Sequence, residues 1–156
     1  MRRRGTGFTL IELVVTLSVI AILAALALPR YIALQTQARV AKTQAIFGGI
    51  RSASALAHAQ VLATNTVTSG ATTISMEGVN VTVMNGYPTA DANGIITATQ
   101  MDPTADQINI TGGGPNAGDL ITININGGTV GSCTVTYQAS AAANTSPGVG
   151  SNTAGC

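Results

Sequence analysis

One uncharged apolar run near the start of the chain, interrupted by a single acid, constrains the fold more than any other feature. The run Phe8–Leu28 would form a helix of about 31 Å, which is enough to cross a bilayer core, and Glu12 is its only charged residue. A charged side chain in hydrocarbon costs roughly 3 kcal/mol and usually has a partner. We therefore expect Glu12 to serve a function.

The missing positive charge would appear if the chain were cut after Gly7. The new amino terminus at Phe8 would lie four residues from Glu12, so the ammonium group of one copy could neutralise the carboxylate of the next. The preceding Arg2-Arg3-Arg4 fits a leader held in the cytoplasm. No specific nucleic-acid partner is predicted, because interleaved aromatic residues and further basic patches are missing around this triplet.

These residues resemble the prepilin segment of type IV pilins and related secretion pseudopilins. The basic leader, Gly7, Glu12 and the apolar run occur in the family's order and spacing, and Pro29 follows the run. In that family a prepilin peptidase cuts after the glycine and methylates the new amino terminus. The resemblance therefore implies cleavage between Gly7 and Phe8, N-methylation of Phe8, and assembly roles for Glu12 and Pro29.

Two other interpretations of the apolar run stay open. A conventional signal peptide would be cut after Ala25-Leu26-Ala27, which satisfies the small-x-small rule. An uncleaved single-pass anchor would keep the whole segment. Both interpretations leave Glu12 unexplained.

The helical pattern continues beyond the apolar run. Pro29 removes one backbone donor and is expected to kink or locally weaken the helix. An apolar stripe then follows one face, which predicts an amphipathic helix packed on a sheet. The stripe consists of Val40, Phe47, Ile50, Ala57 and Val61. A helix from Phe8 to about Leu62 is too long for the head alone to bury, so its apolar half is expected to protrude into lipid or neighbouring copies.

From Ser69 onward the composition favours strands. A hairpin is predicted around Glu77-Gly78, and residues 92–101 are expected to form a short helix. The predicted strands are 72–76, 79–84, 108–110, 120–125 and 134–137. The fold class is therefore α+β, with the second half of the helix against a four- to five-stranded antiparallel sheet.

Cys133 and Cys156 are the only cysteines, and in an exported chain they predict one disulfide closing a C-terminal loop. Closing a loop of this size stabilises by ~3 kcal/mol in the chain-entropy model. Gly86-Tyr87-Pro88, the run Cys133–Tyr137 and the final cysteine also resemble the mannose-sensitive haemagglutinin subgroup of type IV pilins.

Four regions are expected. They are a cleaved leader (1–7), an apolar transmembrane and filament-core helix (8–29), an amphipathic helix half (30–64) and a β-rich head (65–156) with a disulfide loop (133–156).

No catalytic or cofactor-binding pattern is apparent, so neither an enzyme, a cofactor nor a metal is predicted. His58 has no catalytic set of nucleophile and carboxylate arranged around it in sequence, and Gly112-Gly113-Gly114 lacks the lysine of a phosphate loop. Asp102, Asp106 and Asp119 match no compact calcium-loop spacing.

The resulting functional prediction is a type IV pilus subunit, held in the inner membrane as a precursor and then polymerised into an extracellular filament for adhesion, motility or uptake. Its expected partners are other copies of itself, the prepilin peptidase and the inner-membrane assembly machinery. A type II secretion pseudopilin is the first alternative, and a monomeric membrane-anchored binding module is the second.

Charge distribution adds one hypothesis about assembly. All basic residues lie within the first 51 positions, whereas residues 52–156 carry five acids and no basic residue. The basic residues that remain after cleavage are expected to meet acids of neighbouring heads. They are Arg30, Arg39, Lys42 and Arg51.

Overall fold

The computed structural model describes residues 8–67, 69–143 and 145–156. The chain divides into two compact units, Met1–Gln37 and Ala38–Cys156. One helix, α1 (Leu10–Ala63), contributes residues to both units.

The described part of the first unit is helical from Leu10 onward, and all its described side chains are exposed. Pro29 lies inside α1, which continues through this position without a break. A proline inside a helix removes one hydrogen bond, and the surrounding turns keep their helical conformation. The predicted helical span is thus confirmed.

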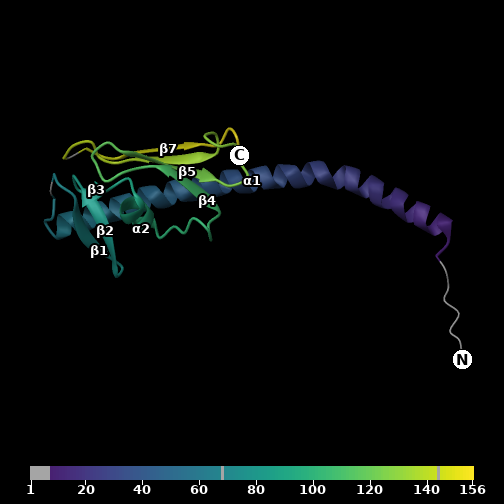
Figure 1. Cartoon of the computed structure of the whole chain (residues 1–156), viewed down its shortest axis with the longest axis horizontal. Coiled ribbons are helices and arrows are strands. Elements are labelled where there is room, and N and C mark those ends of the chain that lie inside the picture. Colours follow the sequence, from purple (N-terminus) through teal and green to yellow (C-terminus); the bar gives the residue numbers. More distant parts are fainter. Residues whose placement is uncertain (1–7, 68, 144) are drawn as a thin grey trace, which may run out of the picture. The chain divides into compact units, whose positions relative to one another are not determined.

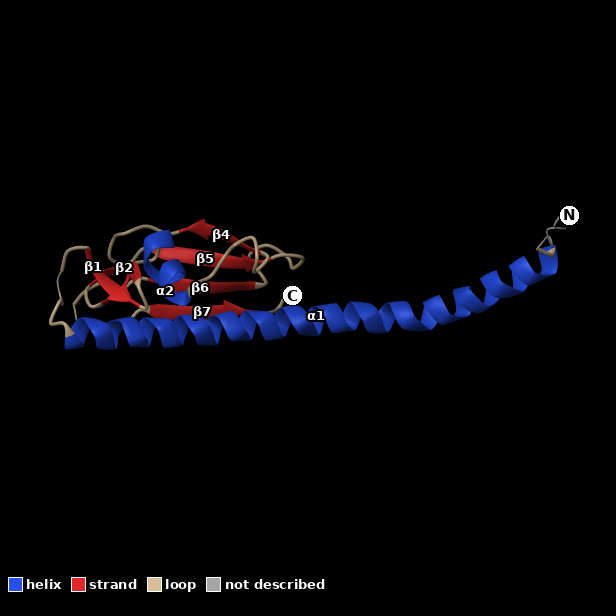
Figure 2. Cartoon of the chain, turned by 90° about the horizontal axis from the view of Figure 1, so that it is seen from below, coloured by secondary structure: helices blue, strands red, loops and turns tan. Residues whose placement is uncertain are grey.

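The second unit combines the remainder of α1 with two antiparallel sheets, of strand order β1-β2-β3 and β4-β5-β6-β7. Figures 1 and 2 show both sheets beside this part of α1, with β1–β3 near its C-terminal end. The strands are β1 (Thr72–Met76), β2 (Val79–Met84), β3 (Tyr87–Pro88), β4 (Ile108–Gly112), β5 (Leu120–Ile125), β6 (Thr134–Gln138) and β7 (Gly148–Asn152). A short helical segment, η1 (Ala92–Ile96) and α2 (Thr97–Thr99), joins the two sheets in sequence.

The apolar stripe of α1 is divided between the two sheets. Ile50 is fully buried in a cluster with inward side chains of β5 and β6, such as Ile123 and Val135. Ala57 and Val61, about two and three turns further on, are buried in a second cluster with β1 and β2. The amphipathic helix predicted from the spacing of these residues is confirmed.

The predicted hairpin is also confirmed, and its turn explains why it forms. Met76 pairs with Val79 across the turn residues Glu77 and Gly78, whose φ angles are +49° and +85°. Two consecutive positive φ values suit a tight two-residue hairpin, whose twist matches that of the flanking strands. Glycine adopts this conformation without a steric cost.

The α+β class is confirmed, but the strands form two sheets and include two that sequence patterns did not indicate. β3 pairs with β2 through only two residues. β7 has the sequence Gly-Val-Gly-Ser-Asn and pairs along its whole length with β6. Apart from Val149, its residues have low β-propensity, so the strand depends on pairing with its neighbour and on the covalent link at Cys156. The expected helix within 92–101 is present as η1 and α2.

The segments that resemble the mannose-sensitive haemagglutinin subgroup contact one another. The buried Tyr137 hydroxyl donates a 2.7 Å hydrogen bond to the Pro88 carbonyl oxygen. His58 of α1 lies against the same segment: its Nδ1 is 2.8 Å from the Gly86 carbonyl oxygen, and its ring stacks on Tyr87 with centroids 4.1 Å apart. The Gly-Tyr-Pro segment is therefore held between α1 and β6.

Candidate functional site

The start of α1 brings Glu12 together with Thr9. The Thr9 hydroxyl and main-chain N–H donate to Glu12 Oε2 at 2.7 and 3.1 Å, and the Glu12 N–H donates to Thr9 Oγ1 at 3.3 Å. This reciprocal arrangement is a capping box, in which two side chains satisfy N–H groups that a helix leaves free at its first turn. Within one chain, Glu12 therefore already has a hydrogen-bonding role.

The other hydroxyls in the apolar run bond to their own helix. Thr16 Oγ1 donates to the Leu13 carbonyl oxygen at 2.9 Å, and Ser18 Oγ donates to that of Val14 at 2.8 Å. Such bonds lower the cost of placing a hydroxyl in an apolar environment. By length and composition α1 can cross a membrane, and none of its most apolar window is buried within the chain. Glu12 is thus the one group in the apolar run whose charge still needs a partner.

The structure places the other predicted assembly residues on or beside the same helix. Phe8 is 76% exposed, and Pro29 lies within α1. Gly7, the predicted cleavage position, lies outside the described residues. Cleavage, N-methylation and the assembly roles therefore stay predictions.

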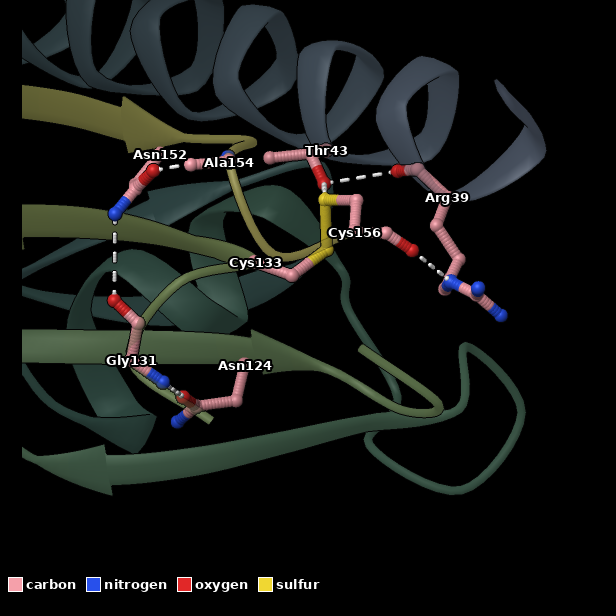
Figure 3. The surroundings of a disulfide bond; sticks show 8 residues. All are labelled: Arg39, Thr43, Asn124, Gly131, Cys133, Asn152, Ala154 and Cys156. Carbon is pink, nitrogen blue, oxygen red and sulfur yellow. Dashed lines mark hydrogen bonds between the residues drawn. A yellow bond between two sulfur atoms is a disulfide. The ribbon is translucent and has the colours of Figure 1, made fainter. Parts of the chain in front are cut away.

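The predicted disulfide between Cys133 and Cys156 is present. Both cysteines are buried, and Figure 3 shows them against α1, next to Thr43. Thr43 Oγ1 lies 3.6 Å from Cys133 Sγ and 3.5 Å from Cys156 Sγ, and it donates to the Arg39 carbonyl oxygen at 2.9 Å. The disulfide thus fixes the last residues against one turn of α1.

Main-chain hydrogen bonds also hold the loop that the disulfide closes. The Gly155 N–H donates to the Ser132 carbonyl oxygen, and the Thr129 N–H donates to that of Gly155, both at 2.8 Å. A Cβ atom on Gly155 would lie 2.5 Å from Ser132 Cβ, so only glycine fits this close approach. The loop that closes at Cys156 is therefore well packed at its end.

Two of the basic residues on α1 also form hydrogen bonds within the second unit. Arg39 Nε donates to the Cys156 carbonyl oxygen, and Lys42 Nζ donates to that of Asp106. Each residue therefore commits a donor within its own chain. Because the acceptors are main-chain carbonyl oxygens, both side chains keep their positive charge and further donors, and the proposed charge pairing between copies still includes all four basic residues.

The three aspartates considered for calcium each bond to main-chain N–H groups in their own turns. Asp102 Oδ1 accepts from Ala105 and Thr104, and these bonds hold the pKa of the Asp102 carboxyl below its ordinary value. Asp106 Oδ2 accepts from Asp102, and Asp119 Oδ2 accepts from Asn116. Among the described residues, no group of three or more His, Cys, Asp or Glu side chains is arranged to hold a metal ion.

Two residues of these sites were missed by the sequence analysis. The capping role of Thr9 was visible as Thr-x-x-Glu before an apolar run, which is a known helix-start pattern. The contact between Thr43 and the disulfide left no such signal, because it joins positions 90 and 113 residues apart.

Comparisons with known proteins match part of this chain. Residues 2–28 match the model of the prokaryotic N-terminal methylation motif. Over 57 residues the chain is 46% identical to the type IV narrow pilus major component PilA5 of Thermus thermophilus. The matched region covers 36% of this chain and 49% of that protein. The chain thus spans about half the length of this curated relative. No solved structure matches.

The motif model covers residues 2–28, the relative is a pilus component, and the fold is a long helix with a disulfide-closed β-rich unit. Together these observations show that part of this chain is similar to a type IV pilus component.

Proposed function

We propose that this chain is the structural subunit of a type IV pilus. The observation that carries the proposal is the coincidence of a methylation motif over residues 2–28 with an apolar helix that holds a single acid at Glu12. The first step is storage, with the apolar part of α1 holding the subunit in the inner membrane. Polymerisation then replaces lipid around this helix with the helices of neighbouring copies.

Glu12 supplies the register of this assembly. In the membrane-bound subunit its carboxylate is stabilised by the capping box with Thr9. In the filament, the amino terminus of Phe8 from an adjacent copy adds the missing positive charge. Buried ion pairs of this kind specify geometry more reliably than they add net stability. The pair therefore selects one stagger between neighbouring helices.

The second unit forms the outer surface of the filament in this proposal. Its acids are directed to solvent or to basic residues of neighbours. The candidates are Arg30, Arg39, Lys42 and Arg51. Exposed ion pairs weaken as salt screens them. If these pairs contribute, filaments of native protein dissociate more readily at 1 M NaCl than at 0.1 M. Equal stability at both salt concentrations would remove this part of the proposal.

The intact mass of protein sheared from cells tests the proposal as a whole. The expected mass is that of residues 8–156 with one methyl group at Phe8 and one disulfide. A chain that still begins at Met1 would contradict it and favour the membrane-anchored binding module. Long filaments in the same sheared material separate a pilin from a secretion pseudopilin, which builds a short periplasmic filament. Adhesion, motility and uptake are all compatible with such a filament.

A further inference from the structure

An exposed valine lies at one end of the second unit. Val130 is 82% exposed and occupies, with Gly131, the centre of a turn in which the Ser132 N–H donates to the Thr129 carbonyl oxygen at 3.0 Å. Gly131 has a φ of +80°, and its N–H donates to Asn124 Oδ1 at 3.2 Å. A side chain on a turn that is already fixed loses little freedom on binding. Val130 is therefore suited to anchor a contact.

The same end of the second unit carries positive charge. A Cβ atom on Gly127, three residues before Val130, would lie 3.4 Å from an Nη atom of Arg39. Lys42 lies about one turn further along α1. Both cations donate to main-chain carbonyl oxygens of their own chain and keep further donors. Val130, Arg39 and Lys42 together are called the basic tip.

A hollow of about 520 Å³ lies at the other end of the second unit, between α1 and β1. Leu56, Ala59 and Ala63 of α1 and Met76 of β1 supply its apolar lining. Leu56 is 56% exposed, so the hollow presents apolar surface that a partner would stabilise by covering it.

Glu77 gives this hollow a negative charge. It is the one charged residue that lines the hollow, and it is exposed. Its Oε2 accepts a 2.9 Å hydrogen bond from the Gln100 side-chain amide. This bond orients the carboxylate and leaves acceptor sites for a further donor. The charge of the hollow is therefore complementary to that of the basic tip.

The basic tip and the hollow cannot meet within one chain. Helix α1 rises about 30 Å between Arg39 and Ala59. Figure 2 shows the C-terminus, beside which the basic tip lies, at one end of the second unit and β1 at the other. A contact between the two surfaces therefore requires two copies of the chain.

From this arrangement we propose that the hollow of one copy receives the basic tip of a neighbouring copy. Val130 packs on Leu56 and Ala59, and Arg39 or Lys42 pairs with Glu77. Because the contact joins unlike surfaces, it repeats from copy to copy, as a helical filament requires. The inference rests on the proposed function, since it names a contact between the outer units of the same filament.

Disulfide cross-linking in filaments sheared from cells tests this contact. Val130→Cys combined with Ala59→Cys is expected to link neighbouring copies and to give a ladder of dimers and larger species on non-reducing gels. Two cysteines bond only when their Cα atoms lie within about 7 Å. Val130→Cys combined with Asn109→Cys is the matched control, because Asn109 is exposed on β4 and does not line the hollow. It should give no ladder.

Val130→Ser tests the apolar anchor without new cysteines. The exposed valine makes little contact within its own chain, so processed subunit should accumulate in the membrane as in the native strain. The yield of sheared filaments is expected to fall at least about tenfold. Leu120→Ser, at a position on β5 that is 49% exposed and does not line the hollow, is the matched control and should give the native yield.

Substitutions of Glu77 test the charge of the hollow. Glu77→Gln can still accept the bond from Gln100 and is expected to lower the filament yield by about 1.5-fold to fivefold, as for an exposed ion pair. Glu77→Lys should lower the yield further, because like charges then face each other. Native yield from Glu77→Lys would contradict the proposed pairing.

Either of two further results overturns the inference. They are a native filament yield from Val130→Ser, and filaments of the Val130→Cys and Ala59→Cys chain that give no ladder. Filaments are present in both cases, so the proposed function would stand. Absence of filaments from the native strain would instead contradict the proposed function itself.

Discussion

The carboxylate of Glu12 accepts hydrogen bonds from both the hydroxyl and the main-chain N–H of Thr9, at 2.7 and 3.1 Å. Glu12 therefore has two separable properties. Its side-chain oxygen caps the first turn of α1, and its negative charge is available to another molecule. Substitutions at these two positions separate the properties, because glutamine can also complete a capping box.

Thr9→Ala is expected to fray the start of α1 without preventing filament formation. The substitution removes the hydroxyl that bonds to Glu12 in both directions, and loss of a cap costs about 1 kcal/mol. Electron microscopy of sheared filaments should show assembly reduced by less than about tenfold. Complete loss of filaments in Thr9→Ala would mean that capping, and not charge, is the main role of this pair.

Removal of the disulfide should destabilise the second unit. The double substitution Cys133→Ser and Cys156→Ser opens a loop of 23 residues in sequence separation and is expected to lower the free energy of unfolding by about 3 kcal/mol. Urea denaturation of the full-length chain in detergent measures this difference. As a control, a reductant should destabilise the native chain and leave the double variant unchanged. Equal stability of the native and double-variant chains would show that the packing of Thr43 and Gly155 holds the loop without the bond.

The buried Tyr137 predicts a loss of stability at alkaline pH. Burial raises the pKa of its hydroxyl well above the ordinary value of 10.0, so the folded chain keeps the proton at pH values where the unfolded chain releases it. The stabilisation is present below about pH 10 and is lost as the pH rises above that value. Tyr137→Phe loses the bond to Pro88, which is expected to cost about 1–2 kcal/mol at pH 7.

The difference in the free energy of unfolding between the native chain and Tyr137→Phe should therefore shrink above pH 10. Urea denaturation of native chain and Tyr137→Phe at pH 7, 9 and 11 measures this change. Tyr31→Phe in the first unit, where the ring is 59% exposed, is the matched control and should not alter stability at pH 7. If the difference in the free energy of unfolding between the native chain and Tyr137→Phe stays constant to pH 11, this prediction is wrong.

The parts of the fold that could be predicted depend on local periodicity. The stripe through Ile50, Ala57 and Val61 follows helical spacing, and the alternation in Leu120–Ile125 follows strand spacing, so both were visible in one sequence. β7 was not visible in the sequence, because its glycines and polar residues form a strand only through pairing with β6. The division into two sheets depends on which strands α1 brings to each cluster, and these contacts are not encoded in local patterns.

The candidate sites likewise include one contact that the sequence predicts and one that it does not. The two cysteines could be paired because the chain has no others, whereas Thr43 could not be placed beside them.

The central claim is that the charge of Glu12 is needed between copies of the chain. Glu12→Gln keeps the capping box with Thr9 and removes only the charge, so counting extracellular filaments of this variant by electron microscopy, with Thr9→Ala beside it, is the most direct test. We predict that Glu12→Gln accumulates in the membrane as processed subunit and forms at least about tenfold fewer filaments than native protein. Filaments of Glu12→Gln in native number would contradict the account.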